Sequence, residues 1–154
     1  MIQLGACFVD DESITFLRNI QPISSDWVPE ALAVSGKSRA DCFVAFPAIQ
    51  VMEEFKEWLM VNAKNDRVVF VSDNAGFDWM FVCWYFHAFL ETNPFGFSCI
   101  SLTSLYKGFA RTMQASFKHL RTTKHTHNAL EDAQGNAGAM RQILRMMEET
   151  PDGE

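Results

Sequence analysis

The sequence contains no hydrophobic run long enough to cross a membrane. The longest one, residues 79–90, spans 12 residues and is interrupted by His87, whereas a membrane-spanning helix needs about 20. The first seven residues carry neither a basic side chain nor a long apolar stretch, so a secretory signal peptide is not expected there. We therefore expect no membrane partner.

Cysteines are few and widely spaced. The chain has 4 of them, Cys7, Cys42, Cys83 and Cys99, and no two form a CxxC pair. This pattern favours buried free thiols in a reducing compartment over disulfide bonds. It predicts a cytoplasmic protein.

Acidic residues are absent between Thr92 and Leu130, although the whole chain has a net charge of −6. The Lys and Arg residues of that window are Lys107, Arg111, Lys118, Arg121 and Lys124. The rest of the chain holds the other 8 of the 13 Lys and Arg residues and all 19 acidic residues. A local positive surface on an acidic protein suits a polyanion held next to a site that needs carboxylates. The alternative is a solvated basic face without a ligand.

The composition is that of one globular domain. Apolar residues make up 48% of the 154 residues and charged ones 21%, a balance that builds a core and excludes disorder as the default state. We expect a single domain over residues 1–150. The tail, residues 151–154, is expected to be frayed.

Hydrophobic periodicity predicts strands and helices in alternation. The expected strands are Ile2–Val9, its hairpin partner Ser13–Ile20, a buried strand at Val68–Val71, and Phe97–Leu102. The expected helices are Pro29–Val34, Pro47–Asn62, Ala75–Leu90, Ser104–Arg111 and Asn128–Glu148. The helix at 75–90 is apolar on nearly every side and is expected to be deeply buried. An antiparallel hairpin followed by strand–helix units indicates an α/β fold with a mixed sheet flanked by helices.

A first polar stretch, residues 72–78, lies where the buried strand passes into the buried helix. Its last residue, Asp78, is followed by Trp79, Met80 and Phe81. A carboxylate in such apolar surroundings is usually paired, hydrogen-bonded or bound to a metal. The alternative is an Asp that only caps the start of the helix.

A second polar stretch, residues 127–133, begins the last helix. His127 precedes the helix and Asp132 lies one turn inside it, so the imidazole can overhang the site that the carboxylate faces. His127 is then a candidate general base, and Asp132 a candidate ligand of a hard cation. The alternative is a loop histidine and an acid that merely complements the helix dipole.

Together, the two stretches resemble the second and third motifs of the DEDDh group of 3′–5′ exonucleases, which have a ribonuclease-H-like fold. The matching residues are Asn74, Phe77 and Asp78 in the second motif, and His127, Ala129, Asp132 and Ala133 in the third. Residues 2–6 are similar to the second strand of that fold, and residues 29–36 to the loop after the third. The resemblance extends from residue 2 to about residue 145.

One family motif has no counterpart. It is an Asp-x-Glu pair on the first strand of the fold, whereas this sequence begins at the segment similar to the second strand. Asp10, Asp11 and Glu12 lie at the far end of that segment, in the expected hairpin turn. We therefore expect the first strand to be missing, the sheet to be interrupted, and its open edges to favour homo-oligomers. We interpret the chain as an N-terminally shortened family member; genuine loss of catalysis is the alternative.

The resemblance implies a chemistry. Asp78 and Asp132 would bind Mg²⁺ or Mn²⁺, and His127 would deprotonate the water that hydrolyses the phosphodiester bond at the 3′ end of single-stranded RNA or DNA. Without the first motif two carboxylates would hold at best one ion, weakly, so impaired activity is expected.

The resemblance also implies where the nucleic acid lies. Its phosphates would contact Lys118, Arg121 and Lys124 in the acid-free segment. Asn74 and Phe77 would lie beside its terminal nucleotides, with the aromatic ring available for stacking on a base.

Two other functions remain open. One is a module that binds single strands or a protein partner without cleaving, which the absent Asp-x-Glu favours. The other is a small-molecule α/β enzyme that uses Asp78 and His127, but the sequence has no Gly-rich phosphate loop to support it.

Overall fold

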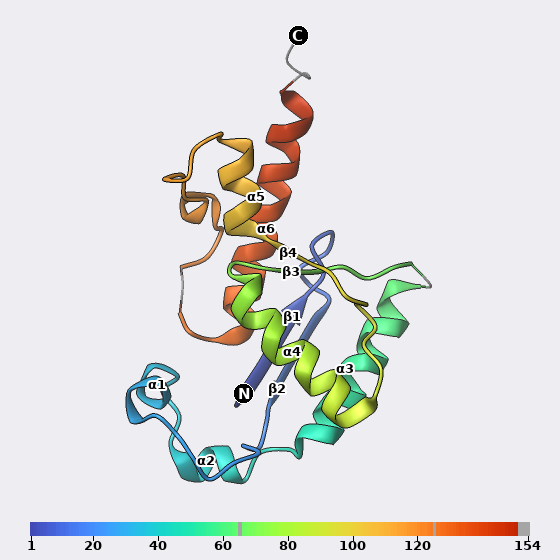
Figure 1. Cartoon of the computed structure of the whole chain (residues 1–154), viewed down its shortest axis with the longest axis vertical. Helices are drawn as coiled ribbons and strands as arrows, with labels where there is room; N and C mark the ends of the chain where they lie inside the picture. The colour runs from blue at the N-terminus through green and yellow to red at the C-terminus, as the bar shows by residue number, and fades with distance from the viewer. Residues whose placement is uncertain (65, 125, 151–154) are drawn as a thin grey trace.

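The computed structural model describes residues 1–64, 66–124 and 126–150 (Figure 1). Its elements are β1 (Gln3–Cys7), β2 (Thr15–Asn19), α1 (Pro29–Val34), α2 (Arg39–Phe43), α3 (Ala48–Ala63), β3 (Phe70–Ser72), α4 (Ala75–Leu90), β4 (Cys99–Ser101), α5 (Leu102–Phe109), the 3₁₀ turn η1 (Lys118–Leu120) and α6 (Ala129–Glu149). The tail expected to fray, residues 151–154, lies outside the described residues.

The predicted hairpin is present. β1 pairs antiparallel with β2, with Gly5 opposite Leu17. Asp11 shapes the connecting turn, because its Oδ1 accepts hydrogen bonds from the Ser13 backbone N–H at 3.0 Å and the Ser13 hydroxyl at 2.6 Å. Such an Asx-type turn explains why the acidic cluster follows the strand.

The sheet is interrupted, as the sequence analysis predicted. Within the described residues β1 pairs with β2, and β3 pairs in parallel with β4, but the two pairs form separate two-stranded sheets. β3 is shorter than the expected strand and comprises only Phe70–Ser72. One edge of β1 and one edge of β3 are therefore without a strand partner among the described residues.

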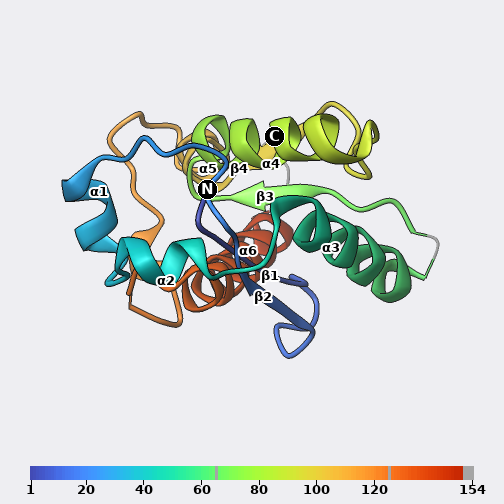
Figure 2. The same ribbon diagram turned by 90° about the horizontal axis from the view of Figure 1, so that it is seen from below.

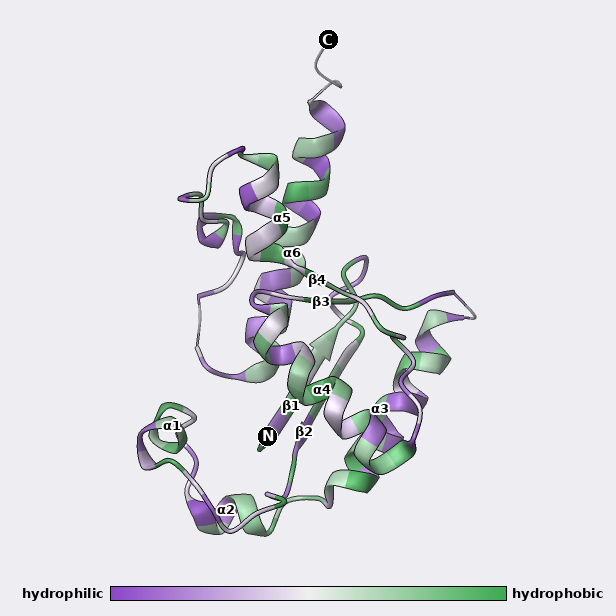
Figure 3. Ribbon diagram, viewed as in Figure 1, coloured by the Kyte–Doolittle hydropathy of each residue, from purple (hydrophilic) through white to green (hydrophobic). Residues whose placement is uncertain are grey.

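The helices lie around these two sheets. Figure 2 shows α4 on one side of β3, with α6 and the hairpin on the other. α3 is amphipathic and buries Val51, Met52, Phe55 and Leu59. α6 alternates hydrophobic and hydrophilic residues along its length (Figure 3) and packs closely against β1. α4 runs over residues 75–90, as predicted.

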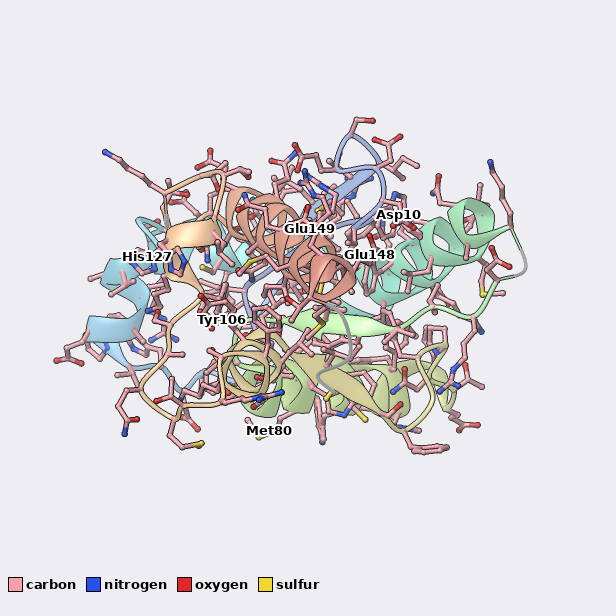
Figure 4. The ribbon with its side chains drawn as sticks, turned by 90° about the horizontal axis from the view of Figure 1, so that it is seen from above. Asp10, Met80, Tyr106, His127, Glu148 and Glu149 are labelled. Carbon is pink, nitrogen blue, oxygen red and sulfur yellow. The ribbon has the colours of Figure 1, made fainter. Side chains whose placement is uncertain are left out.

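The predicted deep burial of α4 is wrong. Its buried side chains lie on one face, but Phe77, Met80 and Trp84 are each more than half exposed, and Met80 points outward in Figure 4. An all-apolar sequence carries no periodicity to show which face is covered, so only the neighbouring elements decide it.

Two helical segments were not expected from the sequence. α2 begins with a capping box, in which the Ser38 hydroxyl accepts from the Asp41 backbone N–H and the Asp41 carboxylate accepts from the Ser38 backbone N–H. η1 is a single 3₁₀ turn. Both are short, and segments of this length lack the periodicity that identifies longer helices.

The core has two parts. One lies between the hairpin, α3 and α4 and is rich in aromatic rings, including Phe16, Phe55 and Phe86. The other joins α5, η1 and α6 around Leu102, Phe117 and Ile143. No helix among the described residues is both long enough and apolar enough to span a membrane.

The cysteines at positions 7, 42, 83 and 99 are free thiols. Burial, aided by the charge of Glu12 and opposed by that of Arg141, raises the pKa of the Cys7 thiol to about 11. We therefore predict that iodoacetamide at pH 8 alkylates Cys7 at least tenfold more slowly in the folded chain than in urea, because only the thiolate reacts. Peptide mass mapping measures both rates, and equal rates would contradict the burial of this thiol.

Candidate active site

A large open cavity lies between the two sheets. Its volume is about 1320 Å³, and residues of both β1 and β3 line it. Hydrophobic side chains of α3 and α4 form part of its wall, among them Trp58 and Val82. Asp78 and Asp132 also line this cavity. The structure thus brings the two predicted metal ligands, 54 positions apart in sequence, to one concavity.

Asp78 lies in the first turn of α4. The turn is closed by the Asn74 carbonyl, which accepts hydrogen bonds from the Phe77 and Asp78 backbone N–H groups. Burial, together with the nearby charge of Asp73, raises the pKa of Asp78, while the Ser72 hydroxyl opposes the shift. Burial of this kind penalises the ionised carboxylate, and a bound cation would relieve the penalty.

Asp73 has a structural role at the same cavity. Its Oδ1 accepts a hydrogen bond from the Thr103 hydroxyl at 2.7 Å, and its carbonyl oxygen accepts from the Ser101 hydroxyl at 3.2 Å. The end of β3 is thereby fixed to the start of α5, which holds the β3–α4 connection in place.

Asp132 is positioned by the way α6 begins. Asn128 caps the helix, because its Oδ1 accepts from the backbone N–H groups of Leu130 and Glu131. Gln3 Oε1 accepts from the Ala129 N–H at 3.1 Å, so β1 is bonded to the first residue of α6. Gly5 lies so close to the backbone of Ala129 that a Cβ atom there would come within 2.4 Å of its carbonyl carbon.

The Asp132 carboxylate is held by a cation from the chain itself. Arg121 Nη2 lies 3.1 Å from Asp132 Oδ1, and only 7% of the Arg121 side chain is exposed. The Thr126 backbone N–H donates to the same oxygen at 3.2 Å. Arg121, predicted as a phosphate contact, is thus engaged with the predicted metal ligand in this structure, a pairing that the sequence spacing did not reveal.

His127 immediately precedes the cap of α6. Its backbone is in the left-handed region, with φ of 63°, and its side chain is exposed. It is not among the described residues that line the cavity. His127 and Asp132 share one helix start, but the cavity residues include only Asp132.

The other predicted contacts lie outside the core. Lys118, Lys124, Asn74 and Phe77 are all exposed. Asn74 and Phe77 line the cavity, whereas neither lysine does. Both lysines lie exposed at the surface, while Phe77 lines the cavity itself.

Of the acids of the hairpin turn, Asp10 also lines the cavity, whereas Asp11 and Glu12 are not among its lining residues. Glu12 Oε2 is paired with Arg141 Nη2 at 2.5 Å, and Asp10 and His127 lie well apart in Figure 4. That the Asp10–Glu12 cluster cannot supply the missing acidic motif stays a prediction.

Comparisons with known proteins place the chain in a family. Residues 1–140 match the sequence profile of the Exonuclease family. The chain is 36% identical over 160 aligned positions to a 3′-5′ DNA exonuclease, Cap18 of Escherichia coli, with 96% of this chain and 84% of that protein covered. The crystal structure of cell-death related nuclease 4 matches 94% of this chain with a TM-score of 0.74 and 18% identity; the chain spans 56% of that protein. This chain belongs to the DEDDh exonuclease family and has its ribonuclease-H-like α/β fold.

Proposed function

We propose that the chain is a metal-dependent 3′–5′ exonuclease acting on single-stranded nucleic acid, with DNA as its first substrate class. One observation carries this proposal. Asp78 and Asp132, each in the first turn of a helix, line the same cavity. Helix N-termini also favour anions such as phosphate. The DNA exonuclease activity in the name of the 36% identical relative supports the choice of DNA.

The residues present suit one divalent ion. The described residues include no group of three or more His, Cys, Asp or Glu side chains placed to hold a metal. Mg²⁺, however, is commonly bound through one or two carboxylates, with waters and substrate phosphates as the remaining ligands. Asp78 and Asp132 would hold such an ion, Mg²⁺ or Mn²⁺, and it would polarise the phosphate and acidify a bound water. A second ion would need further carboxylates.

The protein's own groups would then carry out the proton transfer. His127, which precedes the Asn128 cap of α6, would accept the proton of the water that attacks the terminal phosphodiester. Phe77 would stack on a base at the 3′ end. Asn74 would lie beside the same nucleotide, since both residues line the cavity.

Digestion of end-labelled DNA tests this proposal. With Mn²⁺, a single strand labelled at its 5′ end should shorten progressively from the 3′ end, and a strand blocked at its 3′ end should persist. Asp132→Asn should abolish whatever activity the chain has. Internal cleavage of the blocked strand would identify an endonuclease instead. An RNA strand of the same sequence, run in parallel, would establish the substrate preference.

The exposed lysines are proposed to contact the phosphate backbone. We predict that Lys118→Ala with Lys124→Ala weakens single-strand binding and lowers the slope of log K against log salt by about 1.4, since each phosphate contact contributes roughly 0.7. Fluorescence anisotropy across a salt series measures both quantities. Lys64→Ala with Lys56→Ala, on or beside α3, is the charge-matched control. Equal slopes in both double variants would show that the basic segment is only a solvated face.

A non-cleaving binding module is the second candidate function. It is favoured by the absence, among the described residues, of a cluster of three or more ligand side chains, and by the separate sheets. We propose that the activity of residues 1–154 is impaired for the same reason, and that the open edges of β1 and β3 favour self-association. Sedimentation velocity over a concentration series would detect such oligomers.

A further inference from the structure

The guanidinium of Arg121 is held against α6 by three hydrogen bonds. Its Nη2 donates to Asp132 Oδ1 at 3.1 Å and to the Asp132 carbonyl oxygen at 3.2 Å, while Nη1 donates to Asn136 Oδ1 at 2.9 Å. The exposed fractions are 7% for the Arg121 side chain and 18% for that of Asp132. Both residues line the cavity between the sheets. The ion pair is therefore little screened by solvent and faces the proposed reaction site.

Two glycines of α6 leave the space that residues 121–123 occupy beside the helix. A Cβ atom at Gly135 would come within 2.5 Å of Thr123 Oγ1 and 2.9 Å of Arg121 Nη2, and one at Gly138 within 2.6 Å of Thr122 Oγ1. The segment 121–123 thus lies directly against the helix, where only glycine leaves room. The position of the guanidinium follows from this packing and is not an arbitrary arrangement of a surface side chain.

We propose that Arg121 is a positioning residue that holds Asp132 and competes with a divalent cation for its carboxylate. This inference rests on the proposed metal site. Asp132 Oδ1 already accepts from Arg121 and from the Thr126 N–H, so a cation bound by this carboxylate must share it with a positive group at hydrogen-bond distance. Like charges that close repel strongly in a partly buried site. Arg121 therefore lowers the affinity of the site for Mg²⁺ or Mn²⁺.

Titration with Mn²⁺ tests this role without reference to activity. The full chain is titrated with Mn²⁺, and the electron paramagnetic resonance signal of free Mn²⁺ gives the dissociation constant of the Mn²⁺ complex. Arg121→Met removes the charge but keeps most of the aliphatic stem, and it should bind Mn²⁺ about tenfold more tightly than the wild type, because an adjacent opposite charge alters a carboxylate's equilibria by at least that factor. Arg121→Lys keeps a positive charge beside the carboxylate and should stay within about threefold of the wild type.

Arg141→Met is the matched control, since Arg141 also lies on α6 but pairs with Glu12. It should lose stability without a change in Mn²⁺ affinity. A purely structural role for Arg121 predicts the same result for Arg121→Met, and an affinity unchanged within twofold would overturn the proposal. Should Arg121→Met fail to fold, Gly135→Ala displaces the guanidinium and should also tighten binding. If Asp132→Asn binds Mn²⁺ as tightly as the wild type, Asp132 is not a metal ligand. The proposed metal site and the proposed role of Arg121 would then both be wrong.

Discussion

Extending the chain before Met1 by one strand that carries an Asp-x-Glu pair should raise its exonuclease activity at least a hundredfold. β1 and β3 belong to separate sheets, and residues of both line the cavity of about 1320 Å³ between them. A strand inserted there would pair with two open edges, and both of its faces would be covered by helices. Its acids would join Asp78 and Asp132, and two ions about 3.5–4 Å apart then become possible.

A control fusion distinguishes the effect of the added strand on stability from the effect of its acids on catalysis. A fusion carrying Asn-x-Gln in place of the two acids should gain the same thermal stability as the acidic one but none of its activity. The rate of release of nucleotides from labelled single-stranded DNA in Mn²⁺ measures the difference. Robust activity of residues 1–154 alone, lost in Asp132→Asn, would show that the site is complete without added acids.

Replacing Gly5 by alanine should destabilise the fold by more than about 2 kcal/mol, since overpacking against rigid backbone has no flexible partner to yield. The added Cβ would meet the backbone of Ala129 and Leu130 at 2.4 Å. Either β1 or the start of α6 must move, and Asp132 moves with the helix. We expect a lower melting temperature and a loss of Mn²⁺ binding together.

Gly108→Ala is the control for this substitution. Gly108 lies inside α5, and nothing lies within 4 Å of a Cβ atom built there. Alanine at this helical position should stabilise the chain by about 0.5–1 kcal/mol. Melting curves of the two variants therefore move in opposite directions, and a Gly5→Ala chain as stable as the wild type would contradict the close contact between β1 and α6.

The amino-acid sequence predicted the elements in which hydrophobic residues recur with a clear period. The amphipathic pattern of α3, a last helix beginning near Asn128 and the hairpin were all predicted. The exposed face of α4 was not, because Phe77, Met80 and Trp84 look like core residues until the covering elements are known. Burial on an all-apolar helix is decided by tertiary contacts.

The acids of the candidate site were named from the sequence, but the pairing of Arg121 with Asp132 was not. Asp78 stands out as an acid in an otherwise apolar segment, and Asp132 as an acid one turn inside the last helix, and both line one cavity. Arg121 looked like one basic residue among five in an acid-free segment. Its partner lies 11 positions away on another element, and the close approach depends on Gly135. Spacing within a sequence does not encode such a contact.

A crystal structure of the chain with Mn²⁺ would show directly whether Asp78 and Asp132 bind one metal ion. Anomalous scattering locates the ion independently of any assumption about its ligands. We expect one Mn²⁺ in the cavity, bound by a carboxylate oxygen of Asp78 and one of Asp132 at distances of about 2.0–2.6 Å. No ion at this position, or carboxylates more than about 10 Å apart and therefore unable to share one, would contradict it.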